Sequence, residues 1–197
     1  MLEKLSRDGI YSSLKDMPPG RAAERRGRMV THPIPPVFDS DSEILILGSF
    51  PSVMSRETGF FYGHPKNRFW KVMATVFGAE TPETIAEKRS FLLENRVALW
   101  DVLRSCDING SSDSSIRNAV PNDLDVILRP ARIKKVFVNG KTALAYYEKY
   151  SLPVTGMRAV CLPSTSPANA AWSTERLVAE WKRLLGPGAG EISTEVR

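Results

Sequence analysis

The apolar and polar positions of this chain predict strands that alternate with helices. Four short apolar runs are typical of buried strands, at residues 44–47, 97–103, 135–138 and 159–162. The segments between and after them carry apolar residues at helical spacing or helix start and stop signals, which predicts helices at 68–77, 81–95, 122–128, 142–150 and 171–185. Strands alternating with helices indicate an α/β fold with a mostly parallel sheet covered on both faces.

Two of the predicted helices show clear local signals. Phe69, Val72, Met73 and Val76 recur at the spacing of one core-facing stripe. For the next helix, Thr81 is the expected N-cap, with proline directly after it at the first helical position.

Proline and arginine dominate the first forty residues, which favours extended or mobile chain that becomes ordered only near Pro33. The closing helix ends at a Gly-Pro-Gly sequence. We therefore expect a flexible leader at 1–30, one domain at 31–186 and a disordered tail at 187–197.

Composition limits the function only modestly. A chain of 197 residues with 42% hydrophobic and 25% charged residues can bury one core, and a net charge of +5 permits a polyanionic partner without requiring one. Cys106 and Cys161 stand alone, so we expect both to be reduced and structural, without a disulfide framework or metal site. The start of the chain lacks a signal-peptide core and no run of about 18 apolar residues occurs, which predicts a soluble, cytoplasmic protein.

Small hydroxyl-bearing and amide residues gather directly after two of the predicted strands. The sequence GSFPS follows the first strand at 48–52, and CLPSTSPAN spans the last one and its loop at 161–169. Ligands of open α/β sheets bind beyond the carboxyl ends of the strands. Both loops are therefore expected to face one cleft.

Five segments, in this order and spacing, carry a resemblance to a known family: GSFPS (48–52), YGHPKNRFW (62–70), ALWDVL (98–103), VFVNGKTA (136–143) and LPSTSPAN (162–169). Together they resemble the hypoxanthine-DNA glycosylases, also called DNA-deoxyinosine glycosylases, of the uracil-DNA glycosylase superfamily. The resemblance covers about residues 30–186 and implies a three-layer α/β/α sandwich with a central four-stranded parallel sheet. It also implies monofunctional removal of a deaminated base from DNA, without metal or cofactor.

The resemblance places the family's essential asparagine at Asn67, whose side-chain oxygen could accept from a water or a base edge. The alternative is a helix N-cap, for which asparagine is favoured, and both roles can coexist. Asn139 is expected to contact the extruded base from across the pocket. Its alternative is a turn residue, because Asn-Gly is a common turn dipeptide.

Further residues are assigned to the base pocket: Ser49, Phe50, Pro51, Tyr62 and Trp100. Ser49 and Phe50 stand where the best-known uracil-removing branch carries a residue that activates water, and Trp100 stands where that branch reads uracil. Phe50 is the expected stacking partner of a flipped base.

Other residues are expected to contact DNA: His64, Lys66, Arg68, Ser164, Thr165 and Ser166. Ser164 occupies a position where the superfamily often has histidine. The alternative for the serine-rich loop, residues 161–169, is a simple capping turn. For His64 the alternative is a structural hydrogen bond within its loop, and for Lys66 and Arg68 it is ordinary solvated surface charge.

These expectations combine into a monomeric glycosylase that acts on hypoxanthine first, with uracil and xanthine as further candidate bases. Damaged DNA is its partner, and no membrane, metal or cofactor is expected. The rival hypotheses are a uracil or mismatch-specific glycosylase and a noncatalytic damage-sensing module. The second rival rests on Ser49 and Ser164, where the usual acid or base is missing.

Overall fold

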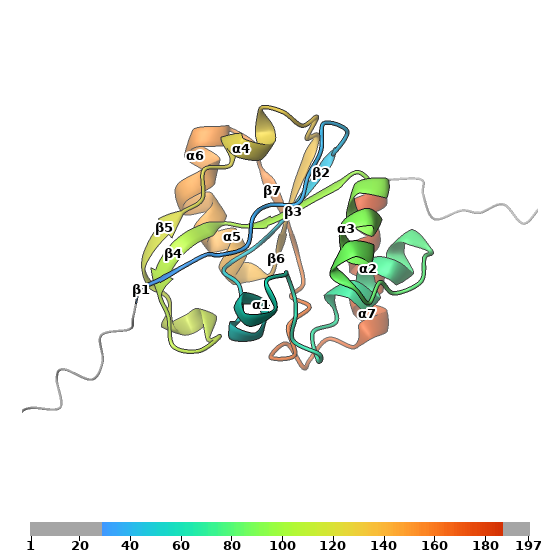
Figure 1. Ribbon diagram of the computed structural model, residues 1–197, viewed down its shortest axis with the longest axis horizontal. Coiled ribbons are helices and arrows are strands. Elements are labelled where there is room, and N and C mark those ends of the chain that lie inside the picture. The colour runs from blue at the N-terminus through green and yellow to red at the C-terminus, as the bar shows by residue number, and fades with distance from the viewer. Residues whose placement is uncertain (1–28, 187–197) are drawn as a thin grey trace, which may run out of the picture.

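A four-stranded parallel sheet forms the centre of the protein, as Figure 1 shows. The computed structural model describes residues 29–186. The sheet has the strand order β3-β2-β6-β7, with β3 at Val97–Asp101, β2 at Ile44–Gly48, β6 at Lys135–Asn139 and β7 at Ala159–Leu162. Leu45, Ile46 and Leu47 are fully buried because helices cover both faces of this sheet.

The helices complete a three-layer α/β/α arrangement, which confirms the predicted fold class. Their bounds are α1 Val53–Thr58, α2 Phe69–Phe77, α3 Ile85–Glu94, α4 Asp125–Leu128, α5 Lys141–Tyr146, α6 Leu152–Thr155 and α7 Thr174–Trp181. In Figure 1, α2, α3 and α7 lie together on one side of the sheet, and α5 and α6 lie on the other. The predicted stripe of α2 is buried at Phe69, Val72, Met73 and Val76.

A second sheet, which the sequence did not predict, is antiparallel and has the order β1-β4-β5. Its strands are β1 at Met29–Thr31, β4 at Leu103–Asp107 and β5 at Arg117–Pro121. The apolar run 97–103, expected as one strand, is divided after Asp101, and its end begins β4. Within the described residues, Met29–Thr31 already form a strand before Pro33, because β1 pairs with β4. The rest of the expected leader and the tail at 187–197 lie outside the described residues.

Several helix boundaries differ from the sequence prediction for local reasons. Thr84, not Thr81, is the N-cap of α3, because its side chain and that of Glu87 form a reciprocal capping box. Helix α1 was expected as loop, and it begins where the Ser52 hydroxyl accepts from the amide of Ser55. The expected helix 142–150 is divided into α5, a π-helical turn at Tyr147–Ser151 and α6.

The two cysteines are free in the described structure, Cys106 buried in β4 and Cys161 half-buried in β7. Among residues 29–186, no helix is both long and apolar enough to cross a membrane.

Candidate active site

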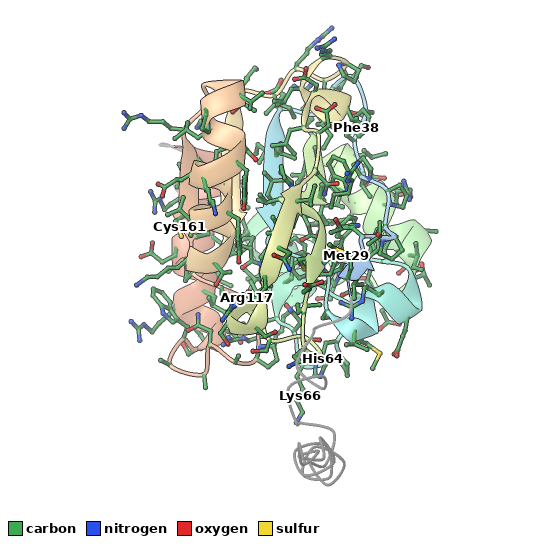
Figure 2. All side chains as sticks on the ribbon, turned by 90° about the vertical axis from the view of Figure 1, so that its left-hand side faces the viewer. Met29, Phe38, His64, Lys66, Arg117 and Cys161 are labelled. Carbon is green, nitrogen blue, oxygen red and sulfur yellow. The ribbon has the colours of Figure 1, made fainter. Side chains whose placement is uncertain are left out.

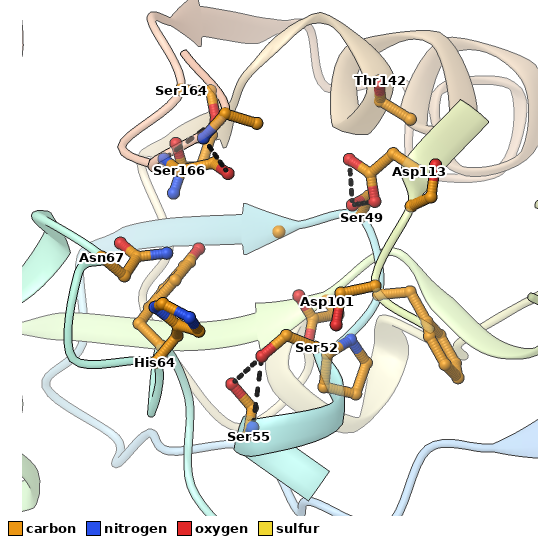
Figure 3. A pocket seen from close by; sticks show the side chains of 18 of the residues that line it. Ser49, Ser52, Ser55, His64, Asn67, Asp101, Asp113, Thr142, Ser164 and Ser166 are labelled. Atoms are coloured by element: carbon orange, nitrogen blue, oxygen red, sulfur yellow. Dashed lines mark hydrogen bonds between the residues drawn. The ribbon is translucent and has the colours of Figure 1, made fainter. Parts of the chain in front are cut away.

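A cavity of about 480 Å³ opens at the carboxyl ends of β2, β3 and β6 (Figure 3). The loops 48–52 and 161–169 both contribute to it, as the sequence predicted. The predicted site residues that line it are Ser49, Phe50, Pro51, Tyr62, His64, Asn67, Asn139, Ser164 and Ser166. Parallel strands end at one edge of a sheet, so residues far apart in the chain meet there.

Two asparagines that line the cavity are joined by a hydrogen-bond chain through Thr165, which lies behind them. The Asn139 amide nitrogen donates to the Thr165 hydroxyl at 3.0 Å, and that hydroxyl donates to Asn67 Oδ1 at 3.0 Å. The Thr165 backbone N–H also donates to Asn139 Oδ1 at 3.0 Å. Thr165 is fully buried and links the two asparagines, so it cannot be the DNA contact that the sequence analysis expected.

This chain also fixes which end of each amide faces the cavity. Asn67 Oδ1 accepts from the backbone N–H of Phe69 at 3.0 Å as well as from Thr165. Two donors therefore occupy the oxygen, and within the described residues Asn67 Nδ2 has no hydrogen-bond partner. Each amide nitrogen carries two hydrogens, and Asn139 Nδ2 uses one of them on Thr165. The wall presents amide N–H donors to a ligand.

The helix-cap alternative for Asn67 is found as well. The bond to Phe69 satisfies an orphan N–H at the start of α2, so capping and a place in the cavity coexist. The expectation that the Asn67 oxygen would face a water or base is not met, because that oxygen is already occupied.

Asp101, which the sequence analysis did not assign, lines the floor of the cavity at the end of β3. A Cβ added to Gly48 would overlap Asp101 Oδ1 and lie 3.2 Å from the Tyr62 hydroxyl. Gly48 thus leaves the space that the Asp101 carboxylate fills. An aspartate directly after four buried apolar residues was the available signal in the sequence.

His32 holds this carboxylate, although the chain was expected to become ordered only near Pro33. Its Nε2 lies 2.8 Å from Asp101 Oδ2, and both side chains are almost completely buried. The backbone N–H of Ile34 donates to His32 Nδ1 at 3.1 Å, so the ring proton resides on Nε2 and is donated to Asp101. No local sequence pattern could have shown this pair.

Asp113 supplies a second carboxylate, from the segment 111–115 between β4 and β5. The Ser49 hydroxyl lies 3.1 Å from each of its oxygens. Desolvation raises the pKa of Asp113, the hydrogen bond from Ser49 opposes the rise, and the negative charge of Asp101 adds to it. The sequence shows no acidic residue at position 49, but the fold brings the Asp113 carboxylate into contact with Ser49.

The structure gives Arg68 a role other than the expected phosphate contact. Its guanidinium donates to the backbone carbonyls of residues 165, 166, 169 and 172. These carbonyls belong to the loop that carries Thr165 and Ser166. Arg68 thus holds the loop against the start of α2, and its donors are engaged inside the protein.

Lys66 is exposed beside the cavity and stays available for DNA, and Figure 2 shows it projecting from the body of the protein near His64. The His64 ring lines the cavity, and its Nδ1 accepts from the backbone N–H of Lys66 at 3.1 Å, which is the structural bond weighed above. Trp100 does not line the cavity. Its indole is buried and donates to the carbonyl of Ile34 at 3.2 Å, which corrects its assignment to the base pocket.

The serine-rich loop is an ordered turn beside the cavity. Ser164 Oγ accepts from the backbone N–H of Ser166 at 3.2 Å, which is the expected turn geometry, and both serines line the cavity. Gly140 has a φ of 98°, and a Cβ there would lie 2.9 Å from the Ser164 Cβ. The Asn139-Gly140 turn therefore lets this loop approach the end of β6 closely.

No group of three or more His, Cys, Asp or Glu side chains that could hold a metal ion occurs among residues 29–186. Amides, hydroxyls, two carboxylates and aromatic rings make up the polar and stacking surface of the cavity.

Comparisons with known proteins agree with this arrangement. The family model of the uracil DNA glycosylase superfamily matches residues 35–185, and the chain belongs to that superfamily. Two curated relatives are each 34% identical and are named hypoxanthine DNA glycosylase. The Methanosarcina acetivorans protein aligns over 159 residues, 80% of this chain and 99% of its own length. The Methanosarcina barkeri protein aligns over 137 residues, 68% of this chain and 85% of its own length.

A solved structure is similar as well. The solution NMR structure of a Methanosarcina acetivorans protein described as a uracil DNA glycosylase has a TM-score of 0.66 and 31% identity. It covers 80% of this chain and 99% of the solved chain.

Proposed function

We propose that this protein is a monofunctional DNA glycosylase that hydrolyses the N-glycosidic bond of deaminated bases, hypoxanthine first. The observation that carries the proposal is the cavity wall in which Thr165 fixes two amides with their N–H groups turned inward. The curated relatives named hypoxanthine DNA glycosylase support the same base, and the superfamily match supports the reaction class.

Base release is assisted by the amide wall. A base that leaves as an anion gathers negative charge on its ring nitrogens and carbonyl oxygen, and preorganised N–H donors stabilise such charge. Asn67 Nδ2 and the second hydrogen of Asn139 Nδ2 are the donors here. Because the Asn67 oxygen already accepts two hydrogen bonds, it is not free to accept one from a water molecule, and its proposed task is charge stabilisation rather than water positioning.

Water activation then falls to a carboxylate, and Asp113 is the candidate. A group whose pKa is raised in a cavity is suited to receive a proton. Ser49 holds its two oxygens, so the carboxylate is oriented at the edge of the cavity. Phe50, which is buried at the cavity with its ring perpendicular to that of His32, is the candidate for stacking on the extruded base.

DNA with a deaminated base is the proposed partner, bound by a monomer in the cytoplasm. The proposed phosphate contacts are Ser164 and Ser166, which line the cavity, and Lys66, which is exposed between the lining residues His64 and Asn67. Arg68 supports this surface through the loop rather than by its own charge.

The test is incubation of the purified protein with duplexes that contain deoxyinosine, deoxyuridine, deoxyxanthosine or no lesion, followed by alkaline cleavage of abasic sites. We expect the fastest cleavage at deoxyinosine. Cleavage at deoxyuridine alone, or at mismatched normal bases, would support the rival glycosylase, and binding without cleavage would support a damage-sensing module.

A further inference from the structure

The Tyr62 hydroxyl is a buried polar group without a partner. It is shielded from solvent, and no side chain or backbone group among residues 29–186 makes a hydrogen bond of normal length and angle with it, although the Asn139 side chain lies close enough to affect its pKa. The Tyr62 ring is stacked on Phe69 with centroids 3.9 Å apart, which holds the hydroxyl at the cavity floor. A buried unpaired hydroxyl is costly, so its position calls for a ligand that supplies the missing partner.

Tyr62 stays protonated and can donate. Burial raises the pKa of this phenol, the negative charge of Asp101 raises it further, and the side chain of Asn139 partly opposes the rise. The hydroxyl is therefore available to donate to an acceptor on a ligand.

Asp101 supplies an acceptor next to this donor. Its Oδ2 is occupied by the His32 Nε2 proton, whereas Oδ1 points at the space above Gly48, the space that the Tyr62 hydroxyl also borders. Only 4% of Asp101 is exposed, so this carboxylate can be satisfied only from within the cavity. The floor thus presents one acceptor and one donor side by side.

This pair matches the edge that deamination creates. Adenine and cytosine present a ring nitrogen acceptor beside an exocyclic amine, whereas hypoxanthine and uracil present a ring N–H donor beside a carbonyl. A carboxylate facing the ring nitrogen accepts from the deaminated base and repels the lone pair of the parent base. Guanine and thymine share the N–H and carbonyl edge, so this pair discriminates against adenine and cytosine only.

We propose that Asp101 and Tyr62 read the deaminated base, Asp101 accepting its ring N–H and Tyr62 donating to its adjacent carbonyl. His32 is the positioning residue that turns Asp101 Oδ1 into the cavity. This inference rests on the proposed glycosylase function and names the chemical edge that the enzyme selects.

The decisive experiment compares single-turnover release of hypoxanthine and of 1-methylhypoxanthine from otherwise identical duplexes. The methylated base lacks the ring N–H, and the cost of extruding it is the same for every enzyme variant. We expect the wild type to prefer hypoxanthine by about 10²-fold or more. In Asp101→Ala the preference should fall below about tenfold, because both the acceptor and the crowding by the carboxylate are removed.

Each alternative gives a different result. If Asp101 were instead the base that activates water, Asp101→Ala would slow both substrates equally and keep the preference, which would overturn the inference. Loss of the preference in Asp113→Asn rather than in Asp101→Ala would overturn it as well. If the wild type released no base from any deaminated duplex, the proposed function would fail before this inference was tested.

Two further variants guard against a folding defect. Asp101→Asn keeps the volume, and the His32 proton should hold its amide oxygen, so an N–H donor would face the ring N–H of hypoxanthine. We expect hypoxanthine release about 10²-fold slower at a wild-type Tm, and a wild-type rate would overturn the inference. Tyr62→Phe keeps the ring stack and should slow hypoxanthine release about tenfold.

His32 is tested through the same preference. His32→Ala should weaken the discrimination between the two bases, and His32→Gln, whose amide can still donate to Asp101, should restore it in part. A binding measurement adds an independent readout: titration with free hypoxanthine, followed by NMR, should give weaker binding to Asp101→Asn than to the wild type. Equal binding to both proteins would count against the inference.

Discussion

At the scale of single residues, the direction of one amide decides what Asn67 can do. Its oxygen is occupied by Phe69 and Thr165, so only N–H donors remain for the ligand. The sequence placed the residue in the site, and its hydrogen-bond partners changed the expected chemistry from accepting to donating. Capping uses the oxygen of this side chain, and the proposed catalytic role uses its N–H groups.

The variant Asn67→Asp separates these two roles. An aspartate keeps an oxygen for the Phe69 N–H, while its second oxygen replaces the donor that faces the leaving base. We expect single-turnover release to fall by roughly 10² or more with little change in DNA binding. A wild-type rate would reduce Asn67 to a helix cap, and Asn67→Ala provides the comparison in which both roles are lost.

Thr165→Val tests the link between the two asparagines. The valine lacks the hydroxyl that accepts from Asn139 and donates to Asn67, while the backbone N–H bond to Asn139 remains. We expect a stability loss of about 1–3 kcal/mol in thermal or denaturant unfolding. Single-turnover release should fall by about tenfold or more, because both donors lose their fixed position. Thr165→Ser, which keeps the hydroxyl, is the matched control and should retain most of the activity.

At the scale of elements, the loop between β7 and α7 depends on one arginine at the start of α2. Arg68 satisfies backbone carbonyls spread over residues 165–172, and these carbonyls have no regular secondary structure to serve them. The same loop carries Thr165 into the cavity wall. A helix on one face of the sheet thereby fixes the loop that completes the site.

Substitutions at Arg68 and Lys66 should therefore change different properties, although the residues are near neighbours: Arg68 affects stability and Lys66 affects DNA binding. Arg68→Ala should lower stability by about 2–3 kcal/mol and slow base release. Arg68→Lys should restore little, because a single ammonium cannot reproduce the planar fork. Lys66→Ala should keep the wild-type Tm and weaken DNA binding. If Arg68→Ala kept the wild-type Tm and only weakened DNA binding, the original phosphate-contact expectation would stand. Thermal unfolding and fluorescence-anisotropy binding measure the two effects.

At the scale of the whole molecule, the cavity collects ionisable groups from separate parts of the chain, and this predicts a pH dependence. Asp113 must be ionised to receive a proton from water, and desolvation raises its pKa above the ordinary 3.8. Base release should therefore decline on the acidic side at a higher pH than an ordinary aspartate would give. In Asp113→Asn the rate should be lower and this acidic limb should vanish; an unchanged limb would assign it to another group. Single-turnover rates measured across pH test this.

The net charge of +5 predicts that DNA binding depends on salt concentration. Arg68 is engaged internally, and among residues 29–186 no Lys or Arg lines the cavity, so we expect few phosphate contacts. We expect the logarithm of the binding constant to fall against the logarithm of salt concentration with a slope of about −2 to −4. Lys66→Ala should reduce this slope by about one unit, on damaged and undamaged duplex alike. An unchanged slope would show that the DNA-binding face lies elsewhere.

The sequence by itself determined the four strands of the parallel sheet, most of the helices that cover it and the two loops that face one cavity. These features follow from local periodicity and turn chemistry, which depend only on residues close together in the sequence. Asn67 and Asn139 were found because they lie in segments that resemble a known family. The boundaries that were missed, such as the division of 97–103 between two sheets, depend on pairing partners far along the chain.

Only the tertiary structure decided how the cavity side chains are paired. His32 and Asp101 are 69 positions apart, Ser49 and Asp113 are 64 apart, and Asn67 and Thr165 are 98 apart. No local pattern encodes such contacts, because each side chain's partner is set by strand register and by the position at which a loop returns to the sheet. The same physical reason turned Arg68 from a surface charge into a loop support and moved Trp100 into the core. The sequence gives the residue types of the cavity. The chemistry that each side chain can offer a ligand depends on which of its donors and acceptors remain without a hydrogen bond in the folded protein.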